Sequence, residues 1–278
     1  MPKILSSAAQ RELLEERLAY WTPERMAGAE PAEFIIGPPP SRPRPAPRPP
    51  GKFSTELVPD PADATYCRVG KLYFTLDGKR QFGSACAINK RGILTAAHLM
   101  YNPTSGKYAT DGLYMPAYDE GGSEKYGSFP LYEVPVIPEE RKTSYSTPQW
   151  DYAFWQTAKG GPDQNSELGE ITGTFTLIVN MRKKQAEWET VGYPGPPPDE
   201  FNGAKMWRCT GKLTADAVGY IAKEGNLTKG SSGGPWRVPG KEFVNGVQSA
   251  NSPKDPGQNF SPYFDKAVEM LYEKAFGS

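Results

Sequence analysis

The sequence predicts an all-β fold, a sandwich or a barrel, over most of its 278 residues. Short apolar runs rich in Val, Tyr, Phe, Trp and Thr follow one another along the chain, separated by turn formers that include 29 Gly and 29 Pro. No helical pattern lies between these runs, so a parallel sheet with crossover helices is not expected. The length suits one large all-β domain or two smaller ones.

The N-terminal region differs from the rest because its apolar residues have helical spacing. Residues 7–21 read as an amphipathic helix with Leu14, Leu18 and Trp21 near one stripe. Thr22, followed by a proline, predicts the cap of a second short helix. We therefore expect a helical pro-segment or regulatory extension over residues 1–36.

A proline-rich linker is expected over residues 37–52, where repeated prolines remove backbone donors and favour an extended polyproline conformation. This linker, or the extension before it, is the predicted contact for a regulatory partner. Residues 53–278 then form the main β domain.

Ten strands are predicted within that domain, at residues 71–76, 84–89, 92–97, 112–117, 152–157, 174–180, 189–193, 206–213, 218–222 and 243–249. The dipeptide Asp77-Gly78 and the segments 89–92 and 194–196 supply turns between them. A C-terminal helix is also predicted, because Phe264, Val268, Leu271 and Ala275 recur at steps of three and four residues.

Composition excludes several classes of function. The 32 Lys and Arg balance the 32 Asp and Glu, and no basic stripe with interleaved aromatics points to nucleic acid. No apolar stretch approaches the roughly 20 residues that span a bilayer. With one histidine and no paired cysteines at ligand spacing, no metal or other cofactor is expected. A calcium ion in the acidic loop 119–122 is the weaker alternative.

The single histidine, His98, ends an apolar run in the motif Thr-Ala-Ala-His. Far downstream lies Gly-Ser-Ser-Gly-Gly-Pro, residues 230–235, and between the two lies Asp151. A serine hydroxyl needs a base to take its proton, and imidazole is well matched to that task. A carboxylate then holds the imidazole in the right tautomer. The residues therefore point to nucleophilic catalysis by Ser232, with neighbouring Ser231 as the other possible nucleophile.

The glycine-serine motif also fits the nucleophile elbow of α/β-hydrolases, in which the order is Ser, acid, His. No histidine follows Ser232, so that assignment lacks a base. The order His98, Asp151, Ser232 is the order of the chymotrypsin-like double barrel.

These three blocks resemble the motif blocks of the trypsin/chymotrypsin-like serine peptidase superfamily. The segments 20–26, 192–194 and 233–236 further resemble secreted bacterial trypsin-like peptidases near the glutamyl-endopeptidase (V8-like) branch. The resemblance covers most of the chain and implies two six-stranded antiparallel β-barrels with a C-terminal helix.

The resemblance also implies roles for single residues. His98 would be the general base and then the general acid, Asp151 would orient it, and Ser232 would form the acyl-enzyme. Backbone N–H groups of Gly230 and Ser232 would form the oxyanion hole, in which loss of one donor typically costs about 10²–10³ in rate.

Specificity is less well determined by the resemblance. It places Asn226 at the base of the pocket for the residue before the scissile bond, with Ser249, Ala250 and Asn251 as wall and substrate-pairing strand. Gln248 stands where glutamyl-specific relatives have histidine, and Lys229 lies beside the oxyanion loop. A hydrogen-bonding pocket is expected.

Two departures from the superfamily carry information. Ser231 replaces the aspartate that many relatives have before the nucleophile, so activation through an ion pair to a freed N-terminus is not expected. Leu99 stands where secreted relatives have a cysteine, which would leave Cys86 without a disulfide partner. Cys209 resembles half of a second disulfide bridge, but the place of its partner, near Gly225, holds no cysteine. Together with Cys67 these are an odd, sparse set, and the prediction is buried free thiols.

The absence of both disulfide bridges and of an apolar signal core favours a cytoplasmic protein. The alternative is a secreted protein whose signal segment is missing from the sequence. The resemblance implies a serine endopeptidase acting on a protein or peptide substrate. A catalytically silent binding or scaffold module with the same fold, and an esterase using the same residues, are the alternatives.

Overall fold

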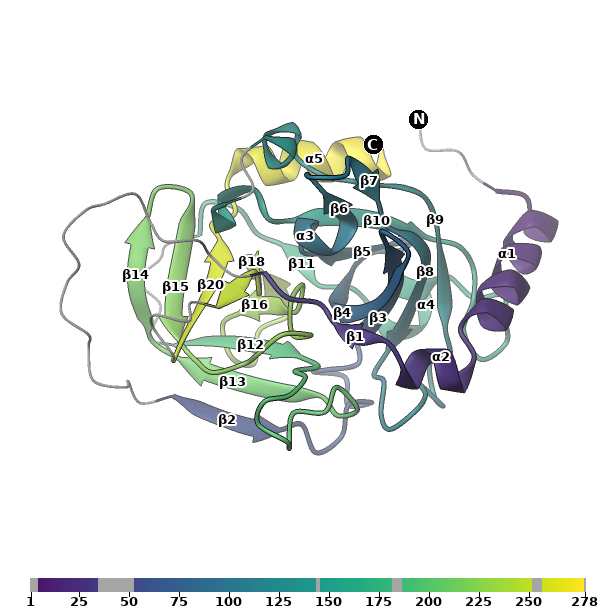
Figure 1. The fold of residues 1–278 in the computed structure, drawn as a ribbon, viewed down its shortest axis with the longest axis horizontal. Helices are drawn as coiled ribbons and strands as arrows, with labels where there is room; N and C mark the ends of the chain where they lie inside the picture. Colours follow the sequence, from purple (N-terminus) through teal and green to yellow (C-terminus); the bar gives the residue numbers. More distant parts are fainter. Residues whose placement is uncertain (1–4, 35–52, 144–145, 182–186, 252–256, 278) are drawn as a thin grey trace.

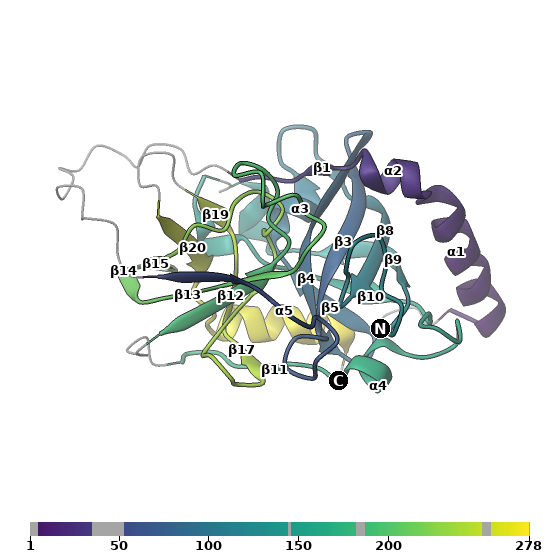
Figure 2. The same cartoon turned by 90° about the horizontal axis from the view of Figure 1, so that it is seen from below.

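A computed structural model describes residues 5–34, 53–143, 146–181, 187–251 and 257–277. The proline-rich stretch 37–52 predicted as a linker lies outside the described residues. The chain is mostly β, with helices near both ends (Figures 1 and 2).

The first half of the main domain is a closed six-stranded barrel with strand order β4-β3-β8-β9-β10-β5, closed by pairing between β4 and β5. Its strands are β3 (Val69–Leu76), β4 (Lys79–Asn89), β5 (Gly92–Thr95), β8 (Thr110–Pro116), β9 (Phe129–Val136) and β10 (Ala153–Thr157). Asp77 and Gly78 both have positive φ, 52° and 76°, which lets β3 turn directly into β4. Gly112 is required by close packing, because a Cβ there would lie 2.6 Å from the Trp155 ring.

The second half contains two sheets that lie side by side (Figure 1). The five-stranded sheet runs β18 (Gly246–Val247), β16 (Pro235–Arg237), β12 (Trp188–Gly192), β13 (Trp207–Gly211) and β2 (Ser54–Leu57). The four-stranded sheet runs β14 (Leu213–Ala217), β15 (Tyr220–Glu224), β20 (Gln258–Pro262) and β19 (Ala250–Asn251). The Val247 amide donates to Ser261 Oγ at 3.1 Å, which joins the two sheets.

Two short pairs of strands complete the β structure: β6 (Tyr101–Asn102) with β7 (Lys107–Tyr108), and β11 (Thr176–Leu177) with β17 (Phe243–Val244). The predicted strands at 174–180 and 243–249 are therefore much shorter than expected. The predicted strand at 92–97 ends at Thr95, and α3 (Ala97–Met100) follows. Other single turns of helix are α4 (Leu168–Thr172), η1 (Glu139–Lys142) and η2 (Pro148–Trp150).

The three predicted helices are confirmed. They are α1 (Ser7–Tyr20), α2 (Pro23–Ala27) and α5 (Lys266–Phe276). The Thr22 hydroxyl caps α2 by accepting from the Arg25 amide at 3.3 Å, and Asp265 caps α5 by accepting from Ala267 at 2.9 Å. Helix α5 buries its predicted apolar face through Val268, Leu271 and Ala275.

The N-terminal arm, which we define as residues 5–34, is docked along the outside of the first barrel (Figures 1 and 2). Leu14 and Trp21 are each only 2% exposed. Trp21 Nε1 donates to the Asp111 carbonyl at 2.6 Å, and the hydroxyls of Tyr20 and Thr75 lie 2.9 Å apart. Beyond α2 the arm adds a short strand, β1 (Glu30–Pro31), in parallel to β4, and this leads the chain toward the centre of the molecule.

Cys67, Cys86 and Cys209 are buried and free, as predicted. The expectation that Cys86 is the residue opposite position 99, where secreted relatives have its disulfide partner, is wrong. Leu99 faces Gly83 instead, since a Cβ on Gly83 would lie 2.5 Å from Leu99 Cδ1. The expectation for Cys209 agrees with the structure, since a Cβ on Gly225 would lie 3.1 Å from its Sγ.

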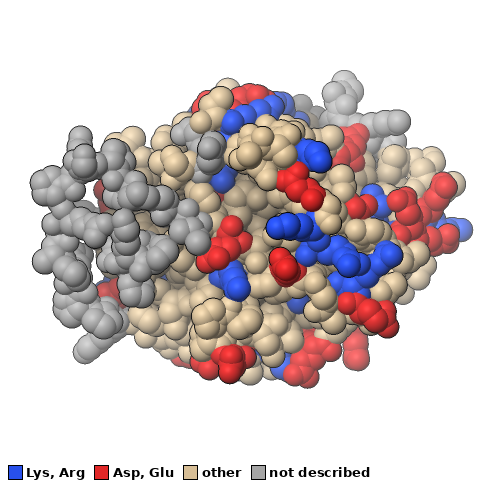
Figure 3. Space-filling model, viewed as in Figure 1, with Lys and Arg blue, Asp and Glu red and all other residues tan. Residues whose placement is uncertain are grey.

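Acidic and basic side chains are interspersed on the face shown in Figure 3, in keeping with the zero net charge. Among the described residues, no helix has the length and apolar character needed to cross a membrane.

Candidate active site

Strand register brings His98 and Asp151 together. Strands β5 and β10 are antiparallel, with Thr95 opposite Ala153. His98 follows the end of β5 by three residues and Asp151 precedes β10 by two, so both lie at the same end of this strand pair. His98 Nδ1 is 2.8 Å from Asp151 Oδ2, and the His98 amide donates to Oδ1 at 2.8 Å. The carboxylate thus fixes both the backbone and the ring of the histidine.

The carboxyl group of Asp151 is fully buried yet well supplied with partners. The Ser249 hydroxyl donates to Oδ2, and Nη2 of Arg141 lies 3.6 Å from Oδ1. Burial alone would raise the pKa of Asp151, but the charges of His98 and Arg141 and the hydrogen bonds from His98 and Ser249 outweigh it and hold the pKa below its usual value. Asp151 is therefore a carboxylate at neutral pH, able to stabilise an imidazolium.

The loop 230–234 is held against the first barrel near His98. The Ser84 amide of β4 donates to the Ser232 carbonyl at 2.8 Å, and the Gly233 amide donates to the Gln248 carbonyl at 2.7 Å. Gly233 has a φ of 85°, and a Cβ there would lie 2.1 Å from the Ser84 carbonyl oxygen. Only glycine fits at that position. The close approach of the loop to β4 places Ser232 between the two halves of the fold.

The two adjacent serines differ in their freedom to react. Ser231 is fully buried, and its hydroxyl donates to the Thr228 carbonyl. Ser232 is 4% exposed, and no hydrogen bond within the described part of the chain engages its hydroxyl. Nε2 of His98 is buried and likewise has no hydrogen-bond partner among those residues. The structure thus pairs His98 with Asp151 and leaves the Ser232 hydroxyl unengaged.

The residues expected to set specificity lie in different environments. Gln248 is buried: its Oε1 accepts from Trp236 Nε1 at 3.2 Å, and its Nε2 donates to Asn251 Oδ1 at 3.2 Å. Ala250 and Asn251 form β19. Ser249, expected in the pocket wall, supports Asp151 instead.

Asn226 does not lie at a buried pocket base. Its side chain is exposed, and its Oδ1 accepts from the Thr55 hydroxyl at 2.5 Å. The buried amide in this region is Asn259, whose Nδ2 donates to the Leu227 carbonyl at 2.9 Å and to Asn251 Oδ1 at 2.7 Å. Lys229 is half-buried, and its carbonyl accepts from the Gly195 amide at 2.7 Å.

Three residues near the histidine carried no signal in the sequence. Arg141 is 2% exposed beside Asp151, although it lies in an ordinary charged segment. Phe34 lies with its ring centroid 5.5 Å from that of His98, and Ala32 accepts a hydrogen bond from the Gly230 amide at 2.8 Å. Ala32 and Phe34 belong to the N-terminal arm, whose path no local pattern specifies.

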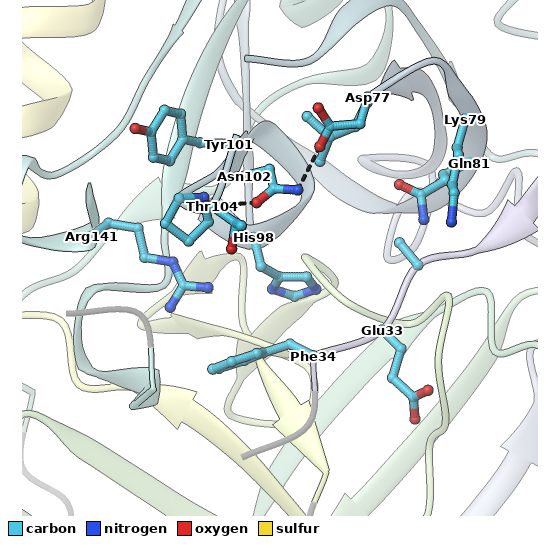
Figure 4. Close-up of a pocket in the computed structure, with 13 residues that line it drawn as sticks. Glu33, Phe34, Asp77, Lys79, Gln81, His98, Tyr101, Asn102, Thr104 and Arg141 are labelled. Carbon is cyan, nitrogen blue, oxygen red and sulfur yellow. Dashed lines mark hydrogen bonds between the residues drawn. The ribbon is translucent and has the colours of Figure 1, made fainter. Parts of the chain in front are cut away.

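A cleft of about 420 Å³ adjoins His98 (Figure 4). The hairpin between β3 and β4, the segment 101–104 after α3, Arg141 and the end of the arm line it. Figure 4 shows the rings of Phe34 and His98 close together, with the Arg141 guanidinium beside them.

The structure is similar to several solved proteases. A thermostable serine protease, AL20, from an extremophilic microorganism is 28% identical with a TM-score of 0.68, and the match covers 77% of this chain and 98% of AL20. The protease Anisep from Arthrobacter nicotinovorans is 24% identical with a TM-score of 0.70, over 81% of this chain and all of Anisep (100%). A Glu endopeptidase is 20% identical with a TM-score of 0.69, over 81% of this chain and 97% of that protein.

No protein-family model and no curated protein sequence matches the chain. The structural matches cover nearly the full length of each protease and confirm the chymotrypsin-like double-barrel fold. The three motif blocks occur in the order typical of that fold. The neighbouring structures are serine proteases with this fold, which supports assignment of the chain to the chymotrypsin-like serine peptidase superfamily.

Proposed function

We propose that this protein is a serine endopeptidase in which Ser232 is the nucleophile, His98 the general base and Asp151 the group that orients His98. The observation that carries the proposal is the hydrogen-bonded pair of His98 and the buried carboxylate of Asp151, near a glycine-rich loop in which no hydrogen bond among the described residues engages the Ser232 hydroxyl. A buried carboxylate behind an imidazole is what a serine hydroxyl needs to become a nucleophile.

In the proposed reaction, Ser232 Oγ attacks the carbonyl carbon of the scissile peptide bond while its proton passes to His98 Nε2. Nδ1–H remains hydrogen-bonded to Asp151, which stabilises the imidazolium. The oxyanion takes hydrogen bonds from the backbone N–H groups of Gly230 and Ser232. His98 then returns the proton to the leaving amine, and water releases the acyl group by the same steps in reverse.

We further propose that the residue before the scissile bond is polar and uncharged. The buried Gln248 and Asn259 and the half-buried Asn251 form a connected group of side-chain amides in the region that the superfamily uses for this pocket. Amides offer both donors and acceptors, so an uncharged polar side chain can join this hydrogen-bonded group, whereas a charged one would find no opposite charge among these amides. Cleavage of a peptide library should show this preference, whereas a preference for Lys or Arg would contradict it.

A serine-directed phosphonate tests the nucleophile directly. Because Phe34 lies on His98, both the full chain and a Phe34→Ala variant should be treated, and mass spectrometry of peptides should find the label on Ser232. Ser232→Ala or His98→Ala should abolish labelling and peptide hydrolysis. Ser231→Ala is the matched control and should keep both, since the Ser231 hydroxyl is held by the Thr228 carbonyl.

Folded chains that never label or hydrolyse a peptide would instead favour a silent binding module. Ester hydrolysis without peptide hydrolysis on the same preparation would favour an esterase.

A further inference from the structure

The last described residues of the N-terminal arm lie between the first barrel and the nucleophile loop of the second half, and they line one side of the cleft beside His98. The Ala32 amide donates to the Phe82 carbonyl of β4 at 2.9 Å, and the Ala32 carbonyl accepts from the Gly230 amide at 2.8 Å. Phe82 belongs to the first barrel and Gly230 to the nucleophile loop. One residue of the arm therefore bridges both walls of the proposed active site.

The hydrogen bond to Gly230 engages a group that catalysis needs. The Gly230 amide is one of the two donors assigned above to the oxyanion hole. A donor that already binds the Ala32 carbonyl at 2.8 Å is not free to bind the carbonyl of a substrate. The arm thus competes with substrate for the same N–H.

Phe34 closes the other side of the site. Its ring centroid is 5.5 Å from that of His98 at an interplanar angle of 32°, and the Arg141 guanidinium carbon lies 4.7 Å from the Phe34 centroid (Figure 4). The His98 side chain is only 7% exposed, and its Nε2 is buried with no partner within the described residues. Nε2 is the atom that must accept the serine proton, and in this arrangement it is closed off from solvent.

The rest of the arm holds this segment in place. Trp21 and Leu14 are buried against the first barrel, and β1 pairs with β4 at Gln81 and Phe82. A ligand tethered in this way has an effective concentration in the millimolar range, so even a modest intrinsic affinity keeps the cleft filled. A segment that only braced the barrel could end at β1, with no need for Ala32 and Phe34 to reach the catalytic groups.

We propose that residues 30–34 are a tethered peptide inhibitor of the active site, and that the groove they fill accepts an extended peptide with an aromatic side chain against His98 and Arg141. This inference rests on the proposed function, because it assigns the regulation of the same site. Displacement of the arm opens the Gly230 amide and His98 Nε2 together.

The test compares the rate of phosphonate labelling at Ser232 in four full-length chains. Phe34→Ala removes the ring from His98, and Ala32→Pro removes the N–H that binds Phe82. Each should raise the labelling rate at least tenfold over the unaltered chain, with a parallel rise in peptide hydrolysis. Leu18→Ala is the matched control: it truncates an apolar side chain of the same arm that is 40% exposed and far from the cleft, and it should leave the rate unchanged.

Thermal unfolding of each chain shows that the barrel stays folded, so that a change in labelling reports on the cleft alone. If the unaltered chain labels as fast as Phe34→Ala and Ala32→Pro, the inhibitor proposal is wrong and the proposed function stands. If the folded variants neither label nor cleave peptides, both the proposed function and the inhibitor proposal are wrong. Rapid self-cleavage between Ala32 and Glu33, seen as a mass change of the unaltered chain, would make the arm a substrate and would overturn its role as an inhibitor.

Discussion

Glu189 and Arg237 form a buried ion pair on adjacent strands β12 and β16, and Glu189→Gln should destabilise the protein strongly. The two residues are paired in register and are 2% and 1% exposed. Arg237 Nε donates to Glu189 Oε1 at 2.7 Å, and Arg237 Nη1 donates to the Thr65 carbonyl at 2.9 Å. The substitution keeps the shape of the side chain but leaves the guanidinium with no anion at this short distance.

An uncompensated buried charge costs about 3–5 kcal/mol. The total stability of a protein domain is about 5–15 kcal/mol, so the loss is a large fraction of the whole. Glu269→Gln is the matched control, because Glu269 pairs with Lys266 on the exposed side of α5, and solvent screening leaves such a pair with little effect on stability.

Urea unfolding followed by circular dichroism measures both variants. The unfolding midpoint should fall sharply for Glu189→Gln and hardly at all for Glu269→Gln, with similar m-values. Replacing both Glu189 and Arg237 by Met should recover much of the loss, since neither charge of this pair then remains buried. A loss below about 1 kcal/mol for Glu189→Gln, or a double variant less stable than the single one, would refute the reasoning.

Three further predictions follow from single side chains. Burial lowers the pKa of Lys71 from 10.5 to about 7, so the unfolded chain binds more protons than the folded one between these values, and stability should rise with pH across that window. Lys71→Met should be more stable than the unaltered chain near pH 7, and urea unfolding at several pH values should show that its stability no longer rises with pH across this window. An unchanged rise of stability with pH in the variant would contradict the assignment of this effect to Lys71. Gly233→Ala should lower Tm and abolish phosphonate labelling, because its Cβ meets the Ser84 carbonyl at 2.1 Å and its φ is 85°. Asp151→Asn, made in the Phe34→Ala background, should reduce kcat about 10⁴-fold while the fold persists, and a reduction below tenfold would contradict the role of Asp151.

Local patterns predicted the elements whose causes are local. The caps at Thr22 and the periodicity after residue 264 determine α2 and α5, and the order of His98, Asp151 and Ser232 indicated the double barrel. Strand β9 was missed, because its two prolines and its left-handed residue Glu133, with a φ of 60°, break the strand pattern.

Tertiary register decided what the sequence could not. Leu99 of α3 faces Gly83 of β4, a contact that depends on how α3 packs against the barrel and that no local pattern specifies. Strand pairing likewise places the side chain of Asn259, 33 positions after Asn226 in the chain, against the Leu227 carbonyl, whereas Asn226 itself is exposed. Phe34 is a single aromatic residue before a proline-rich stretch, and its approach to His98 depends on how the whole arm docks.

His98 is the only imidazole in the chain, and its surroundings make it a spectroscopic reporter. A proton NMR spectrum contains one set of imidazole ring signals, so no assignment by mutagenesis is needed. The ring current of Phe34, at a centroid distance of 5.5 Å, displaces those signals from their usual positions. Their return toward ordinary shifts, followed during addition of a candidate activator, would report the fraction of molecules with an open cleft without any substrate present.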